Sequence, residues 1–185
     1  MDFKLVFSFL IDTFEREKID FALIGGFALQ AAGITRTTKD IDLLILAQDS
    51  VKIKKALLSR GYELLHESKD VLNFLGKKPD LGKIDFLLAH RKYALGMLDR
   101  AVTRPVFDGK LRVKTIGKED LIGLKLQSSV NDPSRYYQDM ADIFSLIREN
   151  YGIIDINLVR EYFEVFNKTD ELEKIIEQVK DAHKK

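Results

Sequence analysis

The sequence predicts a mixed α/β (α+β) protein whose C-terminal region is helical. Up to residue 117, short apolar runs that suit strands alternate with longer stretches of helical periodicity. From Lys118 onward, only helical periodicity remains. An apolar fraction of 45% in 185 residues is enough for a substantial core. This order favours an α/β core over residues 1–117 and a helical region over residues 118–185 that packs on the core.

The first 117 residues contain the predicted strands. Apolar side chains recur at helical spacing at the start of the chain, which predicts an amphipathic helix over residues 3–17. Further helices are expected over residues 27–32, where Gly33 caps the end, and over 50–60 and 91–99. Strands are expected over residues 19–24, 41–46, 62–65, 71–75 and 83–88. The runs 102–107 and 111–113 flank Asp108-Gly109, a dipeptide typical of a hairpin turn.

Four helices are predicted in the C-terminal region. The first begins near Lys118 and stops at Asn131-Asp132-Pro133, because proline disfavours a helical residue before it. The others are expected over residues 134–149, 157–166 and 170–180. The last of them begins with a segment that resembles a capping box, Asp170-Glu171-Leu172-Glu173.

Composition excludes several kinds of function. A net charge of +1 gives no general attraction to nucleic acid or to a membrane surface. The absence of cysteine excludes disulfides, thiolate zinc sites and cysteine nucleophiles, and it suits a cytoplasmic protein. The apolar N-terminal run is interrupted by Lys4 and Ser8, so we expect no signal peptide. No run approaches the roughly 18 apolar residues of a membrane helix, so we expect no membrane partner.

Two glycines and two aspartates stand out in the first fifty residues. Gly25-Gly26 ends one apolar run, and Asp40 and Asp42 open the next. Because a strand alternates its side chains, Asp40 and Asp42 are expected to share one face. Paired carboxylates beside a glycine-rich turn and a helix N-terminus can hold Mg²⁺ and a triphosphate together. The pattern therefore suggests nucleotidyl-transfer chemistry.

This stretch of the chain resembles a known superfamily. Residues 23–46 are similar to the signature of nucleotidyltransferases built on the DNA polymerase β-type fold: a glycine pair, a spacer, and Asp-apolar-Asp, here Gly25-Gly26 and Asp40-Ile41-Asp42. With Gly33 and the segment 36–39 inside it, the stretch resembles small prokaryotic AbiEii-like and minimal-nucleotidyltransferase-like proteins more closely still. The resemblance implies a small mixed, mainly antiparallel sheet with flanking helices.

The resemblance also implies a third carboxylate on a strand beside the Asp-x-Asp strand. Asp85, in the predicted strand 83–88, is its counterpart. Asp40, Asp42 and Asp85 would then form the catalytic set and bind Mg²⁺ or Mn²⁺. Two plainer interpretations stay open. Asp40 also suits a turn at the start of a strand, and Asp85 also suits a solvated strand residue paired with Lys83.

Four residues near the aspartates are expected to contact the nucleotide. Gly25 and Gly26 allow the backbone to approach a phosphate, and the alternative is an ordinary tight turn. Many relatives carry serine in place of Gly26, so only backbone donors would remain here. Arg36 and Thr38 precede the first aspartate, where an arginine can grip a phosphate. The alternative is a solvated loop, or pairing of Arg36 with the carboxylates.

The helical region supplies a further candidate pair. Lys125 lies within an apolar helical face, where a lysine requires a partner or a substrate phosphate. The resemblance implies that Lys125 lies near the nucleotide and that Asp139 orients it. Arg135 and Asp139 are four residues apart, so the alternative is a surface ion pair between them.

The predicted activity is Mg²⁺-dependent transfer of a nucleoside monophosphate from a nucleoside triphosphate (NTP) to a hydroxyl. The acceptor is left open among a protein hydroxyl, a tRNA end and a small molecule. The alternative from another class is a nucleotide- or metal-binding module without turnover, or a toxin–antitoxin component that acts by association. That alternative would take an antitoxin or a second copy of the chain as its partner.

Overall fold

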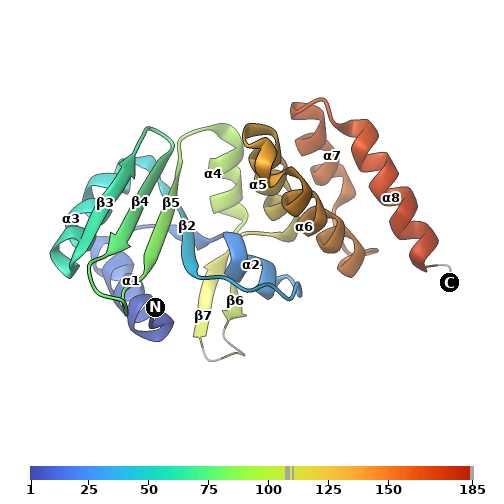
Figure 1. Ribbon diagram of the computed structural model, residues 1–185. Helices are drawn as coiled ribbons and strands as arrows, with labels where there is room; N and C mark the ends of the chain where they lie inside the picture. The colour runs from blue at the N-terminus through green and yellow to red at the C-terminus, as the bar shows by residue number, and fades with distance from the viewer. Residues whose placement is uncertain (107–108, 110, 184–185) are drawn as a thin grey trace. The chain divides into compact units, whose positions relative to one another are not determined.

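The computed structural model describes residues 1–106, 109 and 111–183 (Figure 1). Contacts within the chain divide it into two units. The first unit comprises Met1–Ala31 and Arg36–Ile116, and the second comprises Ala32–Thr35 and the described chain from Gly117 onward. Among the described residues, no helix is long and apolar enough to cross a membrane.

The first unit is a seven-stranded sheet with four α-helices. The strand order is β3-β4-β5-β2-β1-β7-β6. The helices of this unit are α1 (Phe3–Glu17), α2 (Gly25–Ala31), α3 (Ser50–Arg60) and α4 (Lys92–Arg100). The strands are β1 (Phe21–Leu23), β2 (Asp40–Leu46), β3 (Tyr62–Glu67), β4 (Val71–Gly76), β5 (Lys83–Ala89), β6 (Val102–Val106) and β7 (Leu111–Thr115).

The sheet is mixed and mainly antiparallel, which confirms the predicted fold class. Neighbouring strands run antiparallel except at β1–β7 and β2–β5. The parallel pair β2–β5 lies at the centre of the strand order, where residues 41–46 pair with residues 84–89. A parallel pair needs a crossover connection, which here includes α3 and the β3–β4 hairpin.

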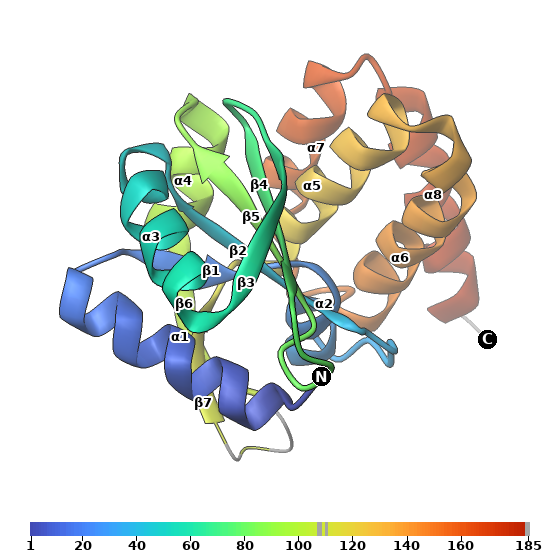
Figure 2. The same cartoon turned by 60° about the vertical axis from the view of Figure 1, so that its left-hand side comes forward.

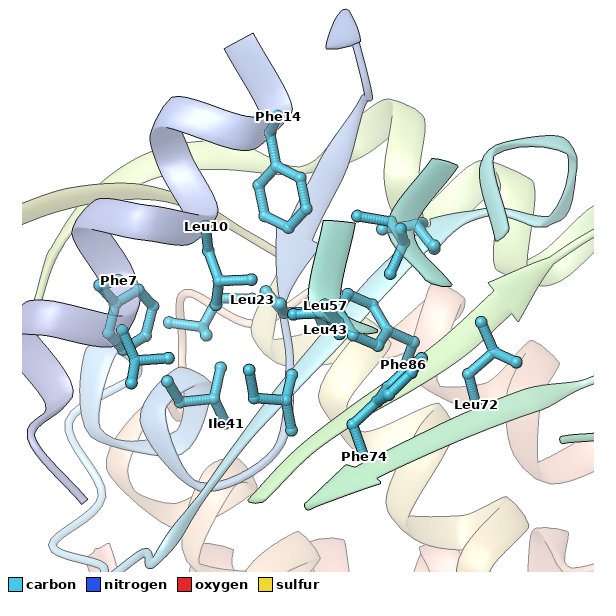
Figure 3. Packing of buried hydrophobic residues seen from close by; sticks show 14 of the residues in the cluster. Phe7, Leu10, Phe14, Leu23, Ile41, Leu43, Leu57, Leu72, Phe74 and Phe86 are labelled. Carbon is cyan, nitrogen blue, oxygen red and sulfur yellow. The ribbon is translucent and has the colours of Figure 1, made fainter. Parts of the chain in front are cut away.

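The core of the first unit lies between one face of the sheet and two helices, α1 and α3 (Figure 2). Figure 3 shows Phe7, Leu10 and Phe14 of α1 pointing toward Leu23 and Leu43 of the sheet. The side chains of this cluster are nearly all excluded from solvent. Residues 41, 43 and 45 of β2 belong to the cluster, so residues 40 and 42 lie on the opposite face of the strand.

The second unit is helical. Its α-helices are α5 (Lys118–Asn131), α6 (Tyr136–Glu149), α7 (Ile156–Val165) and α8 (Thr169–His183), and a short 3₁₀ turn at Pro133–Arg135 precedes α6. α5 packs against α6 and α7, and α8 packs against the same two helices. Asp155 caps α7 by accepting hydrogen bonds from the backbone N–H groups of Asn157 and Leu158.

The observed elements follow the predicted ones closely. The predicted helix over residues 134–149 begins as a 3₁₀ turn, which the Asp132 side chain caps by accepting a hydrogen bond from the Ser134 N–H, and becomes α-helical at Tyr136. The second strand begins one residue earlier than predicted and so contains Asp40. The hairpin strands β6 and β7 are present, whereas Phe107 of the predicted strand and Asp108 of the predicted turn lie outside the described residues.

Candidate active site

The parallel pairing of β2 and β5 places the predicted carboxylates side by side. Asp42 is directly opposite Asp85, and Asp40 is directly opposite Lys83. Residues in register on neighbouring strands share a face, so these four side chains project from the face opposite the aromatic core. The structure thus brings Asp40, Asp42 and Asp85 together. Their catalytic role stays a prediction.

Asp42 is the most perturbed acid of the group. Its pKa is raised from 3.8 to about 6, first by burial and then by the negative charges of Asp85 and Asp40. The positive charge of Lys83 and a hydrogen bond from the Gly26 backbone N–H act in the opposite direction. Removing a carboxylate from water and placing others beside it both favour its protonated form. Asp42 therefore lies where negative charge is poorly compensated.

The glycine pair leaves room for Asp42 and Thr38. Gly25 has a φ of +62°, and a Cβ built there would lie 2.1 Å from Oδ2 of Asp42. A Cβ on Gly26 would lie 2.6 Å from Cβ of Thr38. The pair therefore does more than supply turn dihedrals, because it lets a helix N-terminus approach the carboxylate closely.

Replacing Gly25 with alanine is expected to destabilise the protein by more than about 2 kcal/mol. Two energy costs add together, the strain of alanine in the left-handed conformation and the steric clash of its Cβ with Asp42. The matched control is Gly61→Ala. Gly61 has a φ of +99° but only Leu81 near its Cβ position, at 3.8 Å. The control should cost about 1–2 kcal/mol. Urea denaturation measures both, and equal losses would contradict the close approach of Asp42 to Gly25.

Both oxygens of Asp85 are already bound. Lys83 donates from Nζ to Oδ2 of Asp85 at 2.6 Å, and Asn73 donates from Nδ2 to Oδ1 at 2.7 Å. Burial alone would lower the pKa of Lys83, but the hydrogen bond to Asp85 and the negative charges of Asp85, Asp40 and Asp42 together outweigh burial and raise that pKa. The alternative interpretation, in which Asp85 pairs with Lys83, thus describes an observed contact.

The segment before β2 is held by local hydrogen bonds. The Thr38 hydroxyl donates to the backbone carbonyl of Asp40 at 3.0 Å. The backbone carbonyl of Arg36 accepts a hydrogen bond from Nε2 of Gln30 at 2.6 Å. Thr38 therefore supports the turn that leads into Asp40, and contact of Thr38 or Arg36 with a nucleotide stays a prediction.

Lys125 and Asp139 meet in the second unit. Nζ of Lys125 lies 2.9 Å from Oδ1 of Asp139 and 2.7 Å from Oδ2 of Asp142, and both carboxylates are buried. Arg135 donates from Nε to Asp139 at 3.2 Å and to the Ser128 hydroxyl at 2.8 Å. Asp139 therefore contacts Lys125, as the resemblance implies, and also Arg135, as the alternative implies, although Asp139 is buried and the ion pair is not confined to the surface.

Asp139 is ionised because these partners surround it. Burial would raise the pKa of Asp139, but hydrogen bonds from Lys125, Ser128 and Arg135 outweigh burial and lower it below the ordinary value. The site contributes two cations and two carboxylates, so its formal charges balance. The positive charge of Lys125 is thus already compensated by the carboxylates of Asp139 and Asp142.

Three contributors to these sites are hard to recognise in the sequence. Asn73 is a polar residue on an otherwise apolar strand, which is the same signal that singles out Asp85. Lys83 is visible in the sequence only as a neighbour that can pair with Asp85. Asp142 follows Asp139 by three residues, a spacing that predicts that both aspartates lie on one helix face.

The donor set of the first unit suits a divalent cation. Carboxylate oxygens are the ligands that Mg²⁺ prefers, and the crowding of Asp42 by two other aspartates shows a local excess of negative charge. As the described side chains stand, no three acidic or histidine groups enclose a metal position. The two oxygens of Asp85 are directed to Lys83 and Asn73.

The fold of this chain is similar to those of solved structures. No family model and no curated protein matches the sequence. Several solved structures resemble the chain, and three of them illustrate the similarity. The antibiotic-resistance factor ANT(2'')-Ia matches with a TM-score of 0.62 at 13% identity, covering 99% of this chain and 98% of its own. A nucleotidyltransferase-like protein from Paracoccidioides brasiliensis has a TM-score of 0.55 at 18% identity, with coverages of 95% and 92%. The lincosamide adenylyltransferase LnuA, bound to lincomycin, has a TM-score of 0.51 at 22% identity, with coverages of 76% and 93%.

The chain has the fold of nucleotidyltransferases. At these identities the similarity defines the fold, and the resemblance of residues 23–46 to the superfamily signature is consistent with it. The finer similarity to AbiEii-like proteins stays a prediction.

Proposed function

We propose that the protein is a nucleotidyltransferase that moves a nucleoside monophosphate from an NTP to a hydroxyl acceptor. One observation carries the proposal: Asp42 lies against Gly25 and Gly26, the first residues of α2, and directly opposite Asp85. This arrangement joins a carboxylate cluster to the N-terminus of a helix, where backbone N–H groups favour anions. A triphosphate and its counter-ion need both features together.

In the proposed reaction, the acceptor oxygen attacks the α-phosphorus of the NTP. A new oxygen–phosphorus bond forms, the bond to the bridging oxygen breaks, and pyrophosphate leaves. One carboxylate of the cluster accepts the proton of the acceptor hydroxyl. Mg²⁺ or Mn²⁺, held by Asp40 and Asp42 with Asp85 as the third candidate ligand, would neutralise the charge of the phosphates when bound.

The remaining residues are proposed to position the nucleotide. Gly25 and Gly26 would present backbone donors to the phosphates, and Arg36 and Thr38 would do so from the segment that leads into β2. Lys125 would contact the triphosphate while Asp139 orients it. Arg135 also contacts Asp139, so that carboxylate would keep a cationic partner when Lys125 contacts a phosphate.

Mg²⁺ or Mn²⁺ is expected to strengthen NTP binding at least tenfold, because the three carboxylates repel a triphosphate without a cation between them. Isothermal titration calorimetry with each NTP, in Mg²⁺ and then in EDTA, measures the effect. The control is Asp49→Asn, which alters a buried aspartate on another element of the first unit. Equal affinity in both conditions would refute the shared site.

A transfer assay with labelled NTPs tests the reaction itself. The acceptor panel would hold a tRNA, a hydroxyl-bearing protein and small polyols, because the acceptor class is undetermined. Small antibiotics with hydroxyl groups belong in the panel, since two of the similar structures are described as an antibiotic-resistance factor and an antibiotic adenylyltransferase. Label transfer that disappears in Asp42→Asn supports the proposal, and no transfer to any acceptor argues for the second candidate.

The second candidate is a binding module without turnover, such as an AbiEii-like toxin–antitoxin component. One observation favours it: Lys83 and Asn73 occupy both oxygens of Asp85. Its partner would be an antitoxin or a second copy of the chain. NTP binding without transfer, together with a stable complex in size-exclusion chromatography, would support this candidate.

A further inference from the structure

Lys83 lies within the carboxylate cluster formed by Asp40, Asp42 and Asp85. It precedes Asp85 by two residues on β5, so both side chains share the face of the sheet that carries Asp40 and Asp42. Its ammonium group lies 2.6 Å from Oδ2 of Asp85, and the side chain is only 36% exposed. The β2–β5 register also places Lys83 opposite Asp40, so the negative charges of Asp85, Asp40 and Asp42 all act on its ammonium group.

Asn73 prevents Asp85 from turning away from this lysine. Asn73 is directly opposite Asp85 on the antiparallel strand β4, and its amide donates to the other carboxylate oxygen at 2.7 Å. A cation approaching Asp85 would therefore have to displace an ammonium group on one side or an amide on the other. The two contacts hold the carboxylate in one orientation.

We propose that Lys83 is the resident cation of this cluster and limits it to one divalent ion, held by Asp40 and Asp42. The proposal rests on the proposed function, because it concerns how the same carboxylates receive their metal. Three carboxylates and one ammonium carry a formal charge of −2, which one divalent ion neutralises. Without Lys83 the cluster would carry −3, and Asp85 would be available to a second ion.

Counting bound Mn²⁺ tests the proposal without any measurement of activity. The electron paramagnetic resonance signal of free aqueous Mn²⁺ disappears on binding, so titration of the full chain gives the number of ions per molecule. We expect one ion in the parent protein and two in both Lys83→Met and Lys83→Gln. The glutamine variant keeps a hydrogen-bond donor near Asp85 and guards against misfolding of the methionine variant.

The matched control is Lys54→Met. Lys54 belongs to α3 of the same unit and pairs with Glu67 at 2.8 Å, so the substitution removes an equivalent ion pair on other elements. It should leave the count at one. Two ions in the parent protein, or one ion in both Lys83 variants, would overturn the role of Lys83 and leave the proposed function intact. No bound ion in any variant would overturn the proposed function as well.

Discussion

Asp42→Asn is expected to abolish nucleotidyl transfer while leaving the melting temperature equal or higher at pH 8. The asparagine keeps the size of the side chain beside Gly25 but removes one of three crowded negative charges. Loss of transfer follows from loss of a cation ligand, and the gain in stability follows from relief of burial and repulsion. Differential scanning calorimetry and the labelled transfer assay measure the two effects.

The pH dependence of the same variant gives a sharper test. The pKa of Asp42 rises from 3.8 to about 6 on folding, so between these values the native state binds more protons than the unfolded state. The contribution of Asp42 to stability is therefore most favourable below pH 4 and declines as pH rises through 6. The loss by pH 8 is about 3 kcal/mol at most, because a pKa difference of one corresponds to roughly 1.4 kcal/mol. In Asp42→Asn this decline should vanish.

Asp20→Asn serves as the control, because Asp20 lies outside the cluster and pairs with Lys114 at 2.5 Å. It should retain both the transfer activity and the decline in stability between pH 4 and 8. A large drop in the melting temperature of Asp42→Asn at pH 8 would instead identify Asp42 as a structural residue whose charge the fold requires.

Lys125→Met is expected to lower the free energy of unfolding by about 3–5 kcal/mol, the usual cost of removing one partner from a buried ion pair. The methionine fills the volume of the lysine stem but leaves Asp139 and Asp142 buried with less positive charge. NTP affinity should also fall by on the order of tenfold or more, as for a lost charged hydrogen bond. Urea denaturation and calorimetry separate the two losses.

Two further variants distinguish a structural role of Lys125 from a role in NTP binding. Arg135→Met removes a cation whose side chain is 53% exposed, so it should cost about 1 kcal/mol or less. Lys125→Met combined with Asp139→Asn and Asp142→Asn should recover most of the stability, since no buried charge is left uncompensated. If the combined variant also recovers NTP affinity, Lys125 has only a structural role.

The fold could be predicted from the sequence because its signals are local. Helical spacing around Phe7 and Leu10 predicts α1, and a glycine with positive φ ends α3 at Gly61. The alternation of Asp40, Ile41 and Asp42 predicts which side chains share a face, and the core confirms it. These patterns depend on neighbours a few positions away, which a sequence displays directly.

The contacts within the sites could be predicted only in part, because they depend on pairing between distant strands. Nothing near Asp85 in the sequence shows that Asn73 lies opposite it, since that register is set by the β4–β5 pairing. In the same way, the close approach of Gly25 to Asp42 depends on how α2 meets β2. The pairing of Lys125 with Asp139 could be predicted, because the resemblance to the superfamily implies that Asp139 orients this lysine.

The central parallel pairing of β2 and β5 also bears on the order of folding. Asp42 and Asp85 become neighbours only when β5 pairs with β2, and α3 and the β3–β4 hairpin lie between these two strands in the chain. Contacts between residues so far apart in the sequence form slowly, because the entropy cost of closing the loop comes before the favourable energy of the contact. The electrostatic repulsion of the cluster is therefore absent from early folding and is felt only as the sheet closes. Substitutions that change the charge of this site should therefore have little effect on the first steps of folding. Their main effect should be on the rate of unfolding.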